Sequence, residues 1–88
     1  MAFKIGDLVK WKSQSQSYWK EKTGRIIAIV QPGVIPWDCR NKLYDRTKYH
    51  RQFDGYGRHE VSYLVSVETG PKAKPKLYWP KVSKLEKA

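Results

Sequence analysis

The stretch Val61-Ser62-Tyr63-Leu64-Val65-Ser66-Val67 decides the fold class, because valine or tyrosine occupies every second position in it. A period of two places these side chains on one face of a β-strand. A second strand is predicted for residues 25–30, where Arg25-Ile26-Ile27-Ala28-Ile29-Val30 is stopped by Pro32-Gly33. Since this run is apolar on both faces, we expect it to be covered on both.

The other predicted strands are shorter. Gly6-Asp7 precedes a strand over residues 8–12, and Pro80 ends another over residues 76–79. Residues 81–83 fit one tight turn, and residues 84–87 a last strand. Residues 13–23, polar except for Tyr18 and Trp19, have no periodicity and are predicted to form a loop in which Trp19 is partly packed. Closing about five short strands into a barrel hides the sheet edges, so we expect an all-β, five-stranded barrel.

The predicted core follows from the faces of these strands. Its members are Val9, Trp11, Ile27, Ile29, Tyr63, Val65 and Leu85. Trp79 is expected to be buried as well, with Tyr78 pointing outwards.

These motifs resemble the SH3-like barrels of the KOW and Tudor kind. The resemblance covers residues 3–31 and 61–87, and it rests on the openings Ile5-Gly6-Asp7-Leu8-Val9-Lys10-Trp11 and Gly24-Arg25-Ile26 and on Tyr78-Trp79-Pro80. Hypervariable Tudor-like domains are similar at the first opening. Subunit IV of photosystem I, a small barrel that helps to dock ferredoxin, is similar at Ser17-Tyr18-Trp19. The resemblance implies one SH3-like barrel domain over residues 1–88, with an insertion at 34–60 that forms a hairpin or a short helical excursion.

Composition and charge restrict the class of partner. The 88 residues carry 18 Lys and Arg against 8 Asp and Glu, a net charge of +10, which favours an anionic partner. The single cysteine excludes an internal disulfide and favours a reducing compartment. The longest apolar run, residues 26–30, is far too short to cross a membrane. We therefore expect a cytoplasmic domain without a membrane partner.

Catalysis and metal binding are not expected. Cys39, His50 and His59 lack the spacing of a zinc site, and no signature of a nucleophile surrounds Cys39. The carboxylates of residues 38–60 are scattered among basic neighbours, which favours solvated ion pairs over an acid–base pair. The sequence thus predicts a protein that is not an enzyme, with no cofactor, no metal and no small-molecule substrate.

Binding to nucleic acid is the leading hypothesis, because aromatic residues alternate with Lys and Arg in residues 40–53 and bases stack on rings while cations follow phosphates. The candidate binding residues are Arg40, Lys42, Tyr44, Arg46, Lys48, Tyr49, Arg51, Arg58, Tyr18, Trp19, Lys72, Lys74 and Lys76. In the alternative interpretation the aromatic residues of 40–53 pack against the barrel. A second hypothesis is a docking barrel that recognises an acidic protein surface. We also expect that replacing residues 38–59 by a short turn leaves a folded barrel.

Overall fold

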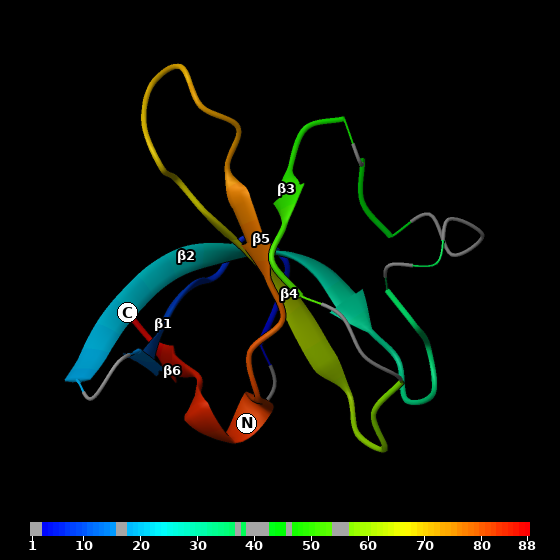
Figure 1. Cartoon of the computed structure of the whole chain (residues 1–88). Helices are drawn as coiled ribbons and strands as arrows, with labels where there is room; N and C mark the ends of the chain where they lie inside the picture. Colours follow the sequence, from blue (N-terminus) through cyan, green and yellow to red (C-terminus); the bar gives the residue numbers. More distant parts are fainter. Residues whose placement is uncertain (1–2, 16–17, 37, 39–42, 46, 54–56) are drawn as a thin grey trace.

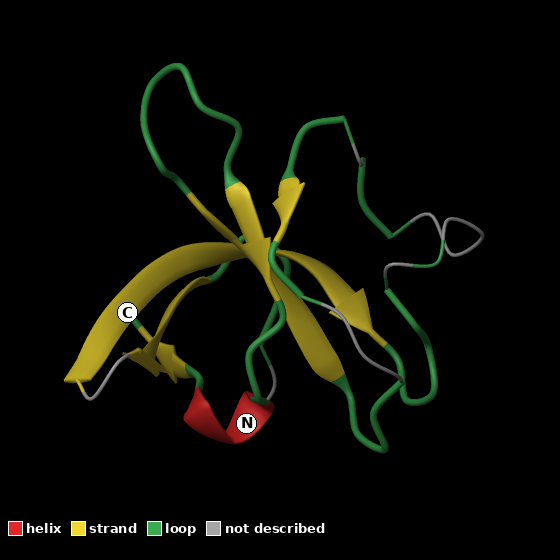
Figure 2. Ribbon diagram, in the orientation of Figure 1, coloured by secondary structure: helices red, strands yellow, loops and turns green. Residues whose placement is uncertain are grey.

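Six strands and one short helical turn form the architecture. The computed structural model describes residues 3–15, 18–36, 38, 43–45, 47–53 and 57–88. The elements are β1 (Leu8–Ser15), β2 (Tyr18–Val30), β3 (His50–Arg51), β4 (Ser62–Val67), β5 (Lys76–Tyr78), the 3-10 turn η1 (Val82–Lys84) and β6 (Glu86–Lys87). They make one curved sheet in the order β3-β5-β4-β2-β1-β6 (Figures 1 and 2). The predicted all-β class is confirmed, and among the described residues no helix is long and apolar enough to span a membrane.

The β1–β2 hairpin is longer than the sequence predicts. Its register runs from Leu8 opposite Arg25 to Ser15 opposite Tyr18, so the polar residues expected to form a loop are largely paired strand. The prediction of a loop is wrong for residues 13–15 and 18–23. In a two-stranded arm, main-chain hydrogen bonds alone hold the strands together. Because the residues here are polar at successive positions, the sequence shows no alternation of apolar and polar residues that would predict a strand.

A β-bulge in β2 changes which isoleucines are buried. Ile26 pairs with Val65 and Ala28 with Leu64, so Ile27 has no partner of its own across the strands. An extra residue of this kind shifts the alternation of side chains by one. The fully buried positions are therefore Ile26, Ala28 and Val30, whereas Ile27 and Ile29, predicted as core, are only half-buried.

Two hydrophobic cores share the central strands β2 and β4. The first core consists of Phe3, Val9, Trp11, Ile26, Tyr63, Val65 and Leu85. The second core consists of Ala28, Val30, Leu64, Leu77 and Trp79. The expectation that residues 25–30 are covered on both faces is confirmed, as is the burial of Val9, Trp11, Tyr63, Val65, Leu85 and Trp79. Tyr78, expected to point outwards, is half-buried between Trp11, at 5.8 Å between ring centroids, and the Lys22 ammonium, 4.2 Å from its ring.

The insertion at 34–60 covers the second core. Leu43, Tyr44, Tyr49 and Phe53 pack against that core, and the Phe53 and Trp79 ring centroids lie 5.8 Å apart. Within the described residues of 34–60 there is neither a hairpin nor a helix; the segment contributes β3, which runs parallel to β5. The amide of His50 donates to the carbonyl of Pro75 (2.9 Å) and that of Gln52 to Leu77 (2.8 Å). The insertion is thus part of the packed structure.

Near Gly57, the end of the insertion packs against the backbone that follows β2. The amide of Gly33 donates to the carbonyl of Arg58 at 2.8 Å. A Cβ atom at Gly57 would stand 2.6 Å from the Gly33 backbone, closer than any side chain can approach. Glycine is required there because two backbone segments meet.

Candidate nucleic-acid interface

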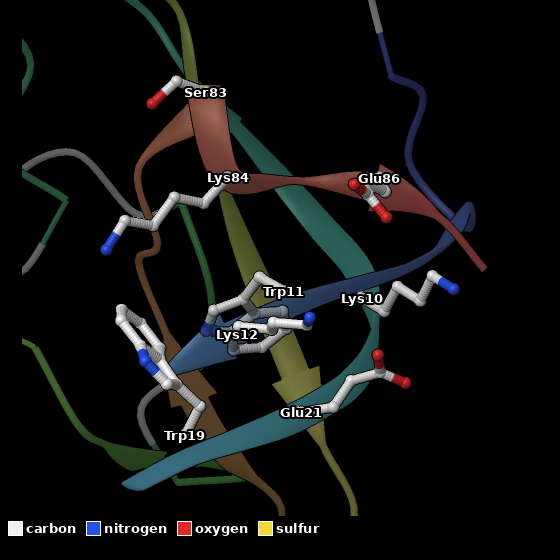
Figure 3. A pocket seen from close by; sticks show the side chains of 8 residues that line it. All are labelled: Lys10, Trp11, Lys12, Trp19, Glu21, Ser83, Lys84 and Glu86. Carbon is white, nitrogen blue, oxygen red and sulfur yellow. The ribbon is translucent and has the colours of Figure 1, made fainter. Parts of the chain in front are cut away.

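A groove of about 280 Å³ lies between the β1–β2 hairpin and the η1–β6 segment (Figure 3). Its lining comes from both ends of the chain: Lys10, Trp11, Lys12, Trp19, Glu21, Ser83, Lys84 and Glu86. The two ends meet because β6 pairs with β1, with Lys87 opposite Val9 and Glu86 opposite Lys10. We call this site the Trp19 groove.

The η1 turn is held in place by main-chain hydrogen bonds and by a buried leucine that follows it. Lys84 donates its amide to the carbonyl of Lys81 (3.0 Å) and Leu85 to that of Val82 (3.1 Å), which closes the turn. Leu85 is buried in the first core, so it anchors the segment that carries Ser83 and Lys84. Ser83 and Lys84 themselves are exposed.

Trp19 is the exceptional side chain of the groove. It is 58% exposed, whereas every other aromatic ring whose burial the structure describes is at least half-buried. The ammonium of Lys84 lies 5.8 Å from the centroid of the indole ring, near the limit of a cation–π contact. An accessible indole beside an ammonium group offers a flat stacking surface and a positive charge at one place.

Charges are unevenly distributed along the Trp19 groove. Figure 3 shows Trp19, Lys84 and Ser83 at one end and Lys10, Glu21 and Glu86 at the other, with Trp11 and Lys12 between them. Strand register accounts for the mixed end, because Lys12 pairs with Glu21 and Lys10 with Glu86. One end of the groove is therefore aromatic and cationic, and the other holds one ammonium group and two carboxylates.

A second groove, of about 490 Å³, adjoins the first. It is lined by Gly57, Arg58, His59, Glu60, Lys81 and Ser83. We call it the Arg58 groove.

The Arg58 side chain is fixed by hydrogen bonds to the backbone and by a contact with the Trp79 ring. Its guanidinium donates to the carbonyls of Trp79 (2.6 Å) and Pro80 (2.8 Å) and lies 4.0 Å over the Trp79 ring. Burial lowers the pKa of Arg58, and Glu60 partly offsets this by raising it. A guanidinium remains charged in proteins despite such a shift, so Arg58 adds positive potential to the groove while its donors stay with the backbone.

Several predicted binding residues gather at a different place, on the β3–β5 edge and the loop that precedes β5. His50 pairs with Lys76, and Arg51 with Leu77. Five of the predicted cations here are exposed, and we call them the basic edge: Lys48, Arg51, Lys72, Lys74 and Lys76. In Figure 1 the β4–β5 loop, which carries Lys72 and Lys74, lies at the end of the molecule opposite η1.

The predicted aromatic residues of the insertion do not form an open surface. Tyr44 and Tyr49 are half-buried, with centroids 6.4 Å apart, and the Tyr44 ring lies 6.2 Å from that of Phe53. This is the packing alternative, in which the rings cover the sheet. Arg40, Lys42, Arg46 and the side chain of Tyr18 lie outside the described residues.

Sequence reasoning found Trp19 but missed its neighbours. Lys12 lies on the strand that pairs with the strand of Trp19, Ser83 and Lys84 lie near the other end of the chain, and Lys81 lines the adjoining Arg58 groove. The signal that would have found them is the closing strand: a last strand paired with the first carries the preceding turn to the first hairpin.

No metal centre is found in the part of the chain that the structure describes, where no three His, Cys, Asp or Glu side chains cluster. A scan against protein-family models, a search of curated proteins and a search of solved structures found no match to this chain.

Proposed function

We propose that this protein is a small SH3-like barrel, without enzymatic activity, that binds single-stranded nucleic acid with little sequence specificity. The order of the strands supports the barrel. β1, β2, β4 and β5 follow one another as antiparallel neighbours, and after one 3-10 turn β6 returns to pair with β1. Val9, Val65 and Leu85, which come from β1, β4 and the segment before β6, meet in the first core, as a barrel requires.

The exposed indole of Trp19 is the observation that carries the binding proposal. A base stacked on this ring leaves its phosphates within reach of Lys84 and Lys12, which line the same groove. Stacking tolerates any base, because every base has a π-face, and ammonium groups attract phosphate without reading sequence. The net charge of +10 adds long-range attraction.

Titration of a fluorescent single-stranded oligonucleotide tests the proposal. If four to six phosphates are neutralised, the logarithm of the affinity should fall with the logarithm of salt with a slope of roughly −3 to −4. The Trp19→Ala variant should bind about 5- to 150-fold more weakly, as expected for the loss of one stacked base at about 1–3 kcal/mol. Trp19→Phe is the control and should retain most of the affinity. Absence of binding at low salt, or equal affinity of Trp19→Ala and the wild type, contradicts the proposal.

The basic edge favours a second candidate, docking to an acidic protein surface. β3 is one of the two edge strands of the described sheet, and four cationic side chains are exposed on or near it: Arg51, Lys72, Lys74 and Lys76. An edge strand flanked by cations suits an extended acidic segment. For this function, Lys72→Glu combined with Lys74→Glu should abolish binding while Trp19→Ala has no effect, the reverse of the pattern expected for nucleic acid.

A further inference from the structure

Ser83 lines both the Trp19 groove and the Arg58 groove, so the exposed η1 turn forms a ridge between them. We propose that one single strand of nucleic acid crosses this ridge, with a base on Trp19 in the first groove and a following phosphate at Lys81 and His59 in the second. This inference rests on the proposed function and adds to it a path and a minimum length. A mononucleotide occupies only the Trp19 groove, whereas a longer strand occupies both.

The charge distribution fixes the direction of the path. Glu21 and Glu86 stand at the end of the Trp19 groove away from Ser83 (Figure 3). Carboxylates repel phosphates, so a strand anchored on Trp19 is not expected to leave by that end. The other exit passes Lys84 and Ser83, where an ammonium group and a hydroxyl donor face a phosphate.

The Arg58 groove then offers cationic groups to the strand. Lys81 and His59 are exposed and line it, and Arg58 contributes its charge from a fixed position. Glu60 is the single acid among the six residues that line this groove, and together with Arg58 and Lys81 it leaves the lining with a net positive charge when His59 is neutral. The balance of charge thus becomes more positive in the direction in which the strand leaves Trp19.

Only an unpaired strand fits this arrangement. Stacking on Trp19 requires a base whose face is free, which a continuous duplex does not present. The Trp19 groove, at about 280 Å³, is small, so successive nucleotides must continue over the ridge. We therefore expect affinity to rise over the first few nucleotides of an oligonucleotide series and then to level off.

A pair of charge reversals tests the path. Lys81→Glu acts on the ridge, and Lys74→Glu is the matched control on the distant β4–β5 loop, with the same change of net charge and an exposed side chain. Lys81 makes no side-chain cap to η1, so its replacement leaves the turn's hydrogen bonds in place. The probe is a series of labelled oligothymidylates of one to eight nucleotides, and circular dichroism confirms that both variants are folded.

Lys81→Glu should weaken binding of the octanucleotide about tenfold more than Lys74→Glu does, and it should reduce the salt slope by roughly 0.7 for each phosphate that is no longer neutralised. With the mononucleotide the two variants should behave alike. Ser83→Glu, which places a charge on the ridge, should also weaken the octanucleotide selectively.

Equal effects of Lys81→Glu and Lys74→Glu at every length overturn the inference. If Trp19→Ala still weakens binding in that case, the proposed function stands without this path. If no oligothymidylate binds at low salt, both the path and the proposed function are wrong. Competition by polyaspartate that is equal in the wild type and in Trp19→Ala also overturns the path, because it assigns the cations to an acidic protein.

Discussion

Two segments of this chain combine aromatic and basic residues but differ in burial. Residues 18–22 and 43–53 both intersperse aromatic rings with basic side chains. In the second segment Tyr44, Tyr49 and Phe53 pack against the second core, whereas in the first Trp19 is 58% exposed. What differs is the neighbouring sheet: the insertion lies on an apolar face of β2, β4 and β5, and the hairpin arm extends past the strands that would cover it. Composition predicts binding by both segments. The two are distinguished only by whether their aromatic rings are packed against the sheet or exposed to solvent.

Excision of residues 38–59 is expected to have the largest effect, and it tests whether the insertion is needed to cover the second core. Replacing them by a short Gly-rich turn uncovers Ala28, Val30, Leu64, Leu77 and Trp79 at once. We expect the shortened protein to lose its cooperative thermal transition, because the free energy of unfolding of a small domain is only a few kcal/mol and the loss of this packing exceeds it. Circular dichroism melts and the dispersion of amide resonances measure this. A folded shortened protein would show that the insertion is dispensable, as the sequence alone predicts.

A matched pair of aromatic-to-alanine variants comes next. Phe53→Ala should reduce the free energy of unfolding by about 3 kcal/mol, since it removes a ring from the cluster with Trp79 and Tyr44. Trp19→Ala should change it by less than about 0.5 kcal/mol, as for a surface substitution. Urea denaturation followed by circular dichroism measures both. Equal losses in the two variants would remove the distinction between packed and exposed aromatic residues.

The sequence predicts the strands that contribute to the cores and also the exposed β6, and it misses β3 and the polar part of the β1–β2 hairpin. β4 and β5 lie in the stretches predicted as strands, residues 61–67 and 76–79, because apolar side chains that enter the cores mark them, and η1 lies one residue after the tight turn predicted at 81–83. The polar part of the hairpin, residues 13–15 and 20–23, has no such pattern. The sequence also cannot predict the bulge at Ile27. Every residue from Ile26 to Val30 is apolar, so the hydrophobic pattern is compatible with any register between β2 and β4.

The site is predicted less completely than the fold. Trp19 is among the predicted binding residues, but it lies on a strand and not in the predicted loop, and its ring is more exposed than predicted. The cations around it are not predicted, because the pairing of β6 with β1 brings Lys84 to it from the other end of the chain. The parallel pairing of β3 with β5 is equally non-local, so the sequence leaves the packing of Tyr49 and Phe53 open.

A buried hydrogen bond provides a smaller test of the second core. The indole Nε1 of Trp79 donates to the hydroxyl of Ser62 at 2.8 Å, and both residues are buried. Ser62→Ala should cost about 1–3 kcal/mol of unfolding free energy, because it leaves the indole donor without a partner. Trp79→Phe removes that donor, so adding Ser62→Ala to it should cost less than it does in the wild type. Additive losses in a double-mutant cycle would show that the hydrogen bond contributes nothing.

The smallest expected effect is a local response to acid inside the insertion. The Asp45 carboxylate accepts hydrogen bonds from the Thr47 amide (2.9 Å) and the Thr47 hydroxyl (2.6 Å). These bonds, the hydroxyl foremost, lower the pKa of Asp45 below its ordinary value of 3.8. A lowered folded pKa means that the contribution to stability is fully present above the ordinary value and is lost as the pH falls through the folded one. The Thr47 amide resonance should therefore shift only below about pH 4, and Asp45→Asn should abolish that transition. A Thr47 transition centred above pH 4, or one that persists in Asp45→Asn, would show that another group orders this turn.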